Sequence, residues 1–145
     1  MNKLAILGKL PTKFKAPFDN PECDIWAFNY HNEPLPRVTK WFDIHAQNPN
    51  PIADVTRDNF PFKEVEELAG GQYFNNTVSY LIAYAILEGY KEIELYGMKF
   101  ITDKESRNGE YQNVREWIFF AKGRGIKISA PADSEMLRQY ALYGV

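Results

Sequence analysis

The sequence predicts an α/β fold, a three-layer sandwich around a mainly parallel sheet of about five or six strands. In the second half of the chain, short apolar runs alternate with two segments of helical periodicity, and such strands pair in parallel through right-handed crossovers. The chain has 145 residues, of which 45% are hydrophobic and 25% charged, close to globular averages. That length provides one full-sized core but not two, so we expect a single domain over residues 1–145.

Charge, apolar runs and cysteine content exclude several classes of protein. Lys and Arg number 17 against 19 Asp and Glu, and the formal charge of −2 argues against nucleic-acid binding. No apolar run approaches the roughly 18 residues of a membrane-spanning helix, and the short apolar N-terminus predicts a strand, not a secretory signal. Cys23 stands alone, which excludes an internal disulfide and a multi-cysteine zinc site. We therefore expect a soluble, cytoplasmic protein that binds neither nucleic acid nor a membrane.

The first half of the chain predicts strands joined by loops. The strands are expected at Lys3–Leu7, Asp24–Tyr30, Val38–His45 and Ile52–Val55. The longer ones are runs of aliphatic, β-branched or aromatic residues bounded by turn-forming residues, a pattern typical of buried strands. The connection Lys9–Glu22 is rich in proline and has few periodic apolar residues, so we expect a loop with room for a helical turn.

The clearest helix is predicted over Asn76–Gly89. Its apolar stripe consists of Val78, Leu81, Ile82, Ala85, Ile86 and Gly89. Asn75 or Asn76 can cap its start, and Gly89 can end it in the left-handed conformation. The rest of the chain predicts a strand at Glu92–Tyr96, a helix at Tyr111–Lys122, a strand at Ile126–Ser129 and a last short helix from Asp133 or Ser134 through Tyr143.

This order of elements is Rossmann-like and places a candidate site at the carboxyl ends of the strands. In such sheets, ligands bind beyond those ends, where the strand order reverses. The rule selects Gly8, Asn29, His45 and Gly97. Asn29 ends its strand where a short amide can contact a base or a sugar, and an Asx turn is the alternative interpretation.

The loop after the first strand is a candidate phosphate-binding segment. Gly8, Pro11 and Thr12 would offer exposed amides and a hydroxyl group to an anion. A plain turn glycine is the alternative interpretation of Gly8. Neither a dinucleotide-binding fingerprint nor a P-loop is present in the sequence.

The start of the clearest helix is a second candidate for anion binding. Asn75, Asn76 and Thr77 stand directly before or at its first turn, where free amides and the helix dipole favour a phosphate. Helix capping uses the same residue types and is the alternative interpretation. Three consecutive capping residues are more than one cap requires.

His45 is the candidate catalytic acid or base, because an imidazole titrates near neutrality. Asp43 lies two residues earlier, projects to the same face and can orient the ring; a structural role at the strand end is the alternative. His31, Asp43 and His45 match no metal-ligand spacing, and we expect no metal. Glu110, a third catalytic candidate, and Tyr111 are expected to close over a ligand, with a solvated connector as the alternative.

Several stretches of the sequence match patterns of known families. Gly89–Phe100 (GYKEIELYGMKF) follows the pattern G-Y-K-E-I-Y-L-x-G-x-D-F, and Asn76-Thr77-Val78 takes the place of a T-S-G element. Through them, Phe74–Phe100 resembles the nucleotide-binding half of Campylobacter-type bacterial sialyltransferases and is similar to archaeal pterin-diphosphokinase-like domains. The whole chain also looks like small phage-encoded proteins, through Ile6–Thr12, Trp41–His45, Glu110–Gln112 and Leu142-Tyr143-Gly144.

The resemblance implies a nucleotide or nucleotide-derived ligand over Gly8, Thr12, Asn29, Asn76 and Thr77, and no other cofactor is expected. If the chain is an enzyme, the resemblance implies transfer or hydrolysis of a phosphate-linked group. A non-catalytic binder that sequesters a host nucleotide signal and a protein–protein inhibitor that keeps only the fold are the alternatives. Aromatic residues make up 15% of the chain, which is equally compatible with a partner interface and with a homodimer.

Overall fold

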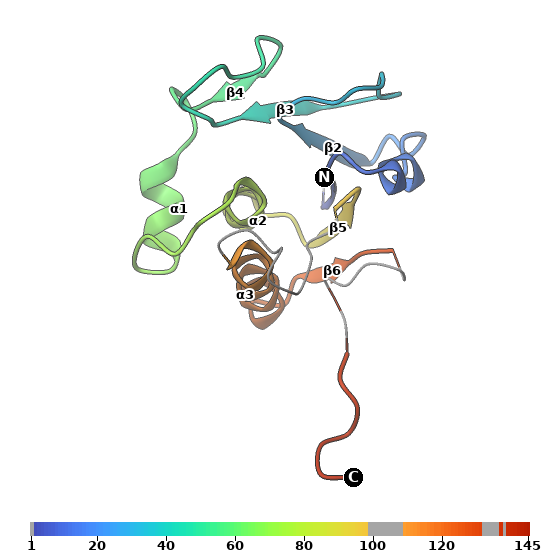
Figure 1. Ribbon diagram of the computed structural model, residues 1–145, viewed down its shortest axis with the longest axis vertical. Helices are drawn as coiled ribbons and strands as arrows, with labels where there is room; N and C mark the ends of the chain where they lie inside the picture. Colours follow the sequence, from blue (N-terminus) through green and yellow to red (C-terminus); the bar gives the residue numbers. More distant parts are fainter. Residues whose placement is uncertain (1, 99–108, 132–136, 138) are drawn as a thin grey trace.

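Six strands form one sheet in which neighbouring strands are parallel (Figure 1). The computed structural model describes residues 2–98, 109–131, 137 and 139–145. The strands are β1 (Lys3–Leu7), β2 (Cys23–Phe28), β3 (Lys40–Asp43), β4 (Val55–Thr56), β5 (Glu92–Tyr96) and β6 (Lys127–Ser129). Their order is β4-β3-β2-β1-β5-β6, so the chain builds outward on one side of β1 and then crosses to its other side. The predicted α/β class and parallel sheet are confirmed.

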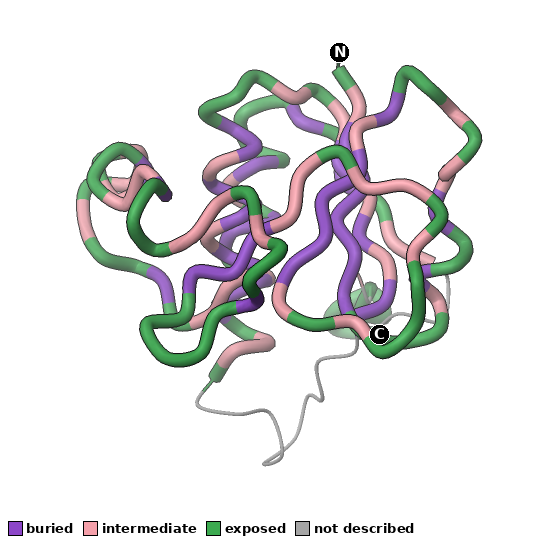
Figure 2. Tube along the Cα trace, turned by 90° about the horizontal axis from the view of Figure 1, so that it is seen from above, coloured by how far each residue is buried: buried purple, intermediate pink, exposed green. Residues whose placement is uncertain are grey.

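The two faces of the sheet are covered differently. The helices are α1 (Phe62–Leu68), α2 (Thr77–Glu88), α3 (Glu110–Gly123) and the short 3-10 helix η1 (Pro11–Lys15). Leu4 and Ile6 of β1 pack in the large core with α1, α2 and α3, whereas Ala5 and Leu7 face a smaller core under the connection that contains η1 (Figures 1 and 2). The outer layer on this second face therefore consists of η1 and loops instead of a long helix.

Both predicted caps of α2 are present. Asn76 has an extended backbone, and its side-chain oxygen accepts a hydrogen bond from the Ser79 amide at 3.0 Å. Gly89 follows the last turn with φ of 89°, a left-handed conformation that glycine adopts without the steric cost of a β-carbon. The start of α2 is therefore fixed in place beside the carboxyl edge of the sheet.

Some predicted elements differ from the structure. Helix α1 is not predicted, because it has seven residues, buries only Val65 fully and has Pro61 as its N-cap residue, without a side-chain cap. Strand β3 ends at Asp43, so His45 lies beyond the strand. The last predicted helix begins outside the described residues, as do residues 99 and 100 of the segment that carries the resemblance. That helix does not reach Tyr143: residues 139–142 are not helical, and Tyr143 is 99% exposed, so no core supports a helix there.

The described helices are too short or too polar to serve as membrane spans.

Candidate functional site

A cavity of about 440 Å³ lies at the carboxyl edge of the sheet, beside the start of α2. Its volume falls in the range of about 300 to 1,000 Å³ that is usual for small-molecule sites. The predicted residues that line it are Gly8, Asn29, His45, Asn75, Asn76, Thr77, Gly97 and Glu110. The lining residues that were not predicted are Lys9, Leu10, Phe28, Val78 and Met98. The loop after β1 and the first turn of α2, two separate candidates in the sequence, thus border the same cavity.

One wall of the cavity is a contact between two glycine backbones. A β-carbon on Gly8 would lie 2.5 Å from the carbonyl oxygen of Gly97, and a β-carbon on Gly97 would lie 2.5 Å from that of Gly8. Gly97 also has φ of 72°. The Gly97 amide donates to Thr12 Oγ1, and its carbonyl oxygen accepts from the Leu10 amide, each at 2.9 Å. Both glycines are therefore required because the ends of β1 and β5 meet here, whether or not a ligand approaches.

The first turn of α2 presents backbone donors to the cavity. Among the described residues, none accepts a hydrogen bond from the amide of Thr77 or Val78, and both residues line the cavity. The Asn76 side chain caps the helix and also donates to Asn113 Oδ1 in α3 at 3.2 Å. These contacts are those of a structural helix cap, which is the alternative interpretation of this residue. The Asn75 amide donates to the same Asn113 oxygen at 3.0 Å. The free amides at this helix start are a favourable position for negative charge.

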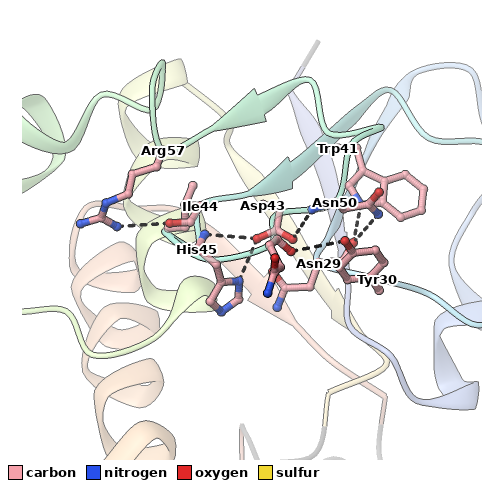
Figure 3. A network of polar contacts seen from close by, with 9 residues as sticks. Asn29, Tyr30, Trp41, Asp43, Ile44, His45, Asn50 and Arg57 are labelled. Atoms are coloured by element: carbon pink, nitrogen blue, oxygen red, sulfur yellow. Dashed lines mark hydrogen bonds and ion pairs between the residues drawn. The ribbon is translucent and has the colours of Figure 1, made fainter.

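Asn29 has a constrained backbone and a buried side-chain oxygen. Its φ of 62° is in the left-handed region, which residues other than glycine seldom adopt. Its carbonyl oxygen accepts from Trp41 Nε1 at 2.7 Å and from Asn50 Nδ2 at 3.0 Å, and these bonds hold the conformation (Figure 3). In the described part of the chain, Asn29 Oδ1 is buried and has no hydrogen-bond partner. Since an unpaired buried oxygen is costly, this atom is suited to accept a hydrogen bond from a ligand.

Asp43 and His45 form a hydrogen-bonded pair beyond the end of β3 (Figure 3). His45 Nδ1 lies 2.8 Å from Asp43 Oδ1. Burial of Asp43 opposes its ionisation, but hydrogen bonds from the Asn50 amide and from the ring and amide of His45 outweigh burial and hold the pKa of this carboxyl below its usual value. Asp43 is therefore charged at neutral pH. It orients the imidazole without itself lining the cavity.

The other predicted residues have different positions. Pro11 begins η1 and Thr12 ties that segment to the end of β5, and neither is among the lining residues. Glu110 lines the cavity from the first turn of α3. Tyr111 is next to Glu110 but does not line the cavity, and the Arg115 guanidinium lies 5.9 Å from its ring centre. Of these four residues, Glu110 lines the cavity, and Pro11, Thr12 and Tyr111 do not.

The second histidine belongs to a separate polar cluster. Lys13 is fully buried, and its Nζ donates to Glu33 Oε1 at 2.9 Å and to His31 Nδ1 at 3.1 Å. Burial, reinforced by the charge of Lys13, lowers the pKa of His31 to about 4. His31 thus does not join the pair of Asp43 and His45. Among the described residues, no three His, Cys, Asp or Glu side chains gather in a way that could hold a metal ion.

Comparison with known proteins supports the fold. No protein-family model matches the chain, and none of the curated proteins matches it. In structure it is similar to the sialyltransferase CST-II, solved in complex with a trisaccharide acceptor and CMP, with a TM-score of 0.50 and 17% sequence identity. The likeness covers 92% of this chain and 83% of that chain. At this identity it shows a shared Rossmann-like α/β fold, in agreement with the predicted class.

Proposed function

We propose that this chain binds a nucleotide or a nucleotide-derived small molecule in the cavity at the carboxyl edge of its sheet. The observation that carries the proposal is the convergence, in one cavity, of the free amides of Thr77 and Val78 with the buried, unpaired oxygen of Asn29. The first two suit a phosphate, and the third suits a hydroxyl or amino group of a sugar or base. The fold likeness to a protein solved with CMP supports the same ligand class.

In this arrangement, the phosphate lies at the start of α2, within reach of the Thr77 hydroxyl. Lys9 also lines the cavity and adds a positive charge near that end. The nucleoside extends toward Asn29, whose backbone is fixed by Trp41 and Asn50. Because the backbone of Asn29 is held before the ligand arrives, little backbone conformational entropy is lost at this position on binding.

Isothermal titration of the full chain with CMP tests this proposal. Thr77→Val removes the hydroxyl at nearly constant shape, and Asn29→Gly removes the carboxamide while tolerating the left-handed backbone. We expect each variant to bind CMP about tenfold more weakly, since one lost hydrogen bond corresponds to about 1.4 kcal/mol. Gln47→Ala, an exposed change outside the cavity lining, serves as the control and should bind like the parent chain.

The proposal is wrong if CMP, UMP, AMP, GMP, a nucleotide sugar and a pterin all fail to bind at millimolar concentration. It is also wrong if a nucleotide binds but neither variant weakens it. The pterin is included because of the resemblance to archaeal pterin-diphosphokinase-like domains.

Three finer expectations form part of the same proposal. A phage source and action in the cytoplasm of the host rest on the resemblance of the whole chain to phage-encoded proteins. A homodimer rests on the aromatic content of 15%. Sedimentation of the purified chain over a range of concentrations tests the dimer directly, since a monomer throughout would contradict it.

A further inference from the structure

The pair formed by Asp43 and His45 carries an inference that rests on the proposed function. Asp43 is 1% exposed, yet both of its carboxylate oxygens are hydrogen-bonded. Oδ1 accepts from the His45 amide at 3.2 Å and lies 2.8 Å from His45 Nδ1, and Oδ2 accepts from the Asn50 amide at 2.9 Å (Figure 3). Such a carboxylate cannot turn away from the ring without leaving buried donors unpaired.

The carboxylate also determines which nitrogen of His45 carries the proton. An ionised carboxylate only accepts hydrogen bonds, so Nδ1 of the imidazole must be the donor. In the neutral ring, Nε2 then holds a free electron pair. Figure 3 shows this second nitrogen directed away from Asp43. The His45 side chain is 56% exposed and lines the cavity, so a base is available where the ligand is proposed to bind.

The local structure does not require the imidazole. The turn after β3 is shaped by the two amides that donate to Asp43, those of His45 and Asn50. A ring that is more than half exposed adds little apolar burial. The ring is therefore held in place by a buried charge although the fold gains little from it, an arrangement usual for proton-transferring groups.

We propose that His45 is the catalytic base in hydrolysis of a phosphate ester or anhydride bond of the bound nucleotide, and that Asp43 is its positioning residue. Nε2 takes a proton from water as the water oxygen forms a bond to phosphorus. The bond from phosphorus to the leaving oxygen breaks on the opposite side of the phosphoryl group, the leaving oxygen takes a proton from solvent, and the imidazolium releases its proton to solvent. One water is consumed, and no atom is oxidised or reduced.

The surroundings of His45 fit the charge that develops in this step. Negative charge grows on the phosphoryl oxygens, and the amides of Thr77 and Val78 in the same cavity can donate to them. Asn50 links the two halves of the site: its amide holds Asp43, and its side chain holds the carbonyl oxygen of Asn29 at 3.0 Å. Asn50 therefore fixes the distance between the nucleoside end and the base.

Hydrolysis of the p-nitrophenyl ester of thymidine 5′-monophosphate by the full chain tests the inference, with binding of thymidine 5′-monophosphate measured in parallel by calorimetry. His45→Asn keeps a donor that can reach Asp43 but removes Nε2, the nitrogen proposed as the base. We expect kcat to fall about 100-fold, within the usual contribution of a general base, while Kd for the monophosphate changes less than about twofold. Gln47→Ala should leave both values unchanged.

Asp43→Asn tests the positioning role separately. We expect kcat to fall at least about tenfold with little change in KM, because the ring loses its fixed tautomer while the binding groups remain. Correlation of ring nitrogens and protons by NMR provides a second readout that needs no substrate. It should show Nδ1 of His45 protonated in the parent chain and a mixed tautomer in Asp43→Asn.

The outcomes separate this inference from the proposed function. If the monophosphate binds but the ester is recovered intact, the inference is overturned. That outcome indicates a non-catalytic binder. Hydrolysis that His45→Asn leaves unchanged also overturns the inference. If no nucleotide binds measurably, the proposed binding function fails, and the inference that rests on it fails with it.

Discussion

The two histidines of this chain have opposite environments, although each follows a strand of the same sheet. His31 is partly buried beside the lysine Nζ of Lys13, and its ring lies edge-on to Trp41 at 5.4 Å. His45 is exposed and is held by the carboxylate of Asp43. Burial and the cation beside it oppose protonation of the His31 ring. The cluster of His31, Lys13 and Glu33 therefore serves stability, and the pair of Asp43 and His45 is available for chemistry.

The largest expected loss of stability follows from changes in the cluster of His31, Lys13 and Glu33. Lys13→Ala empties a fully buried position and leaves His31 Nδ1 without its donor, so we expect the free energy of unfolding to fall by about 3 kcal/mol. Lys13→Met keeps most of the volume and should lose about 1 kcal/mol. Urea denaturation of both variants measures the difference. Equal losses would show that the charge, and not packing, is what this cluster contributes.

A smaller loss of stability is expected for changes in the pair of Asp43 and His45. Asp43→Ala leaves the amides of Asn50 and His45 without their acceptor, so we expect about 2 kcal/mol of lost stability in the same assay. Asp58→Ala, at an exposed position nearby, is the matched control and should change stability by less than about 0.5 kcal/mol. Equal effects of the two changes would mean that burial of Asp43 confers no special role.

The pH dependence of stability should separate the two regions. The pKa of His31 is about 4 in the folded chain against its usual 6.5, so between these values the unfolded chain binds a proton that the folded chain does not. The contribution of the neutral His31 ring to the free energy of unfolding is complete above about pH 6.5 and is lost as the pH falls toward 4. The pKa of Asp43 is below its usual 3.8, so its contribution is lost only in still more acid solution.

His31→Gln keeps an acceptor for Lys13 but cannot titrate, and it provides the check. Unfolding midpoints measured from pH 7 to pH 4 should fall less steeply for this variant than for the parent chain. Identical slopes would contradict the assigned environment of His31.

The smallest effect is expected for His45→Asn. The side chain is exposed and the new amide can still donate to Asp43, so the free energy of unfolding should change by less than about 0.5 kcal/mol. A thermal melt followed by circular dichroism is sufficient to test this. A loss above about 1 kcal/mol would make His45 a structural residue like His31 and would remove the contrast between them.

Much of the fold is predictable because its signals are local. The stripe on α2 and the caps at Asn76 and Gly89 are encoded within one segment, and so are the apolar runs of β1 and β5. Helix α1 has no such signal, since its fully buried residue Val65 gains its contacts from the remainder of the core. The same apolar runs predict where the strands end. Gly8, Asn29 and Gly97 follow those ends, and all three line the cavity.

The contacts that organise the site are not local, and the sequence does not predict them. Thr12 bonds the Gly97 amide from 85 positions away, so its hydroxyl serves the fold and not the cavity lining. Lys13 is buried while Lys15 is exposed, although nothing in the sequence distinguishes them. Asn50 lies in a segment with ordinary turn composition, yet it connects Asp43 with Asn29. These roles depend on which strand ends become neighbours in the sheet.

The wall formed by Gly8 and Gly97 constrains how this protein can evolve. It consists of peptide groups in contact, and a side chain at either position would collide with the other strand end. Substitution at these two positions therefore cannot change the chemistry of the cavity. Divergence in ligand preference among chains that share this architecture must arise at positions such as Asn29, Thr77 and Glu110. An engineer who wishes to redirect the site must keep these two glycines and can vary the other lining residues.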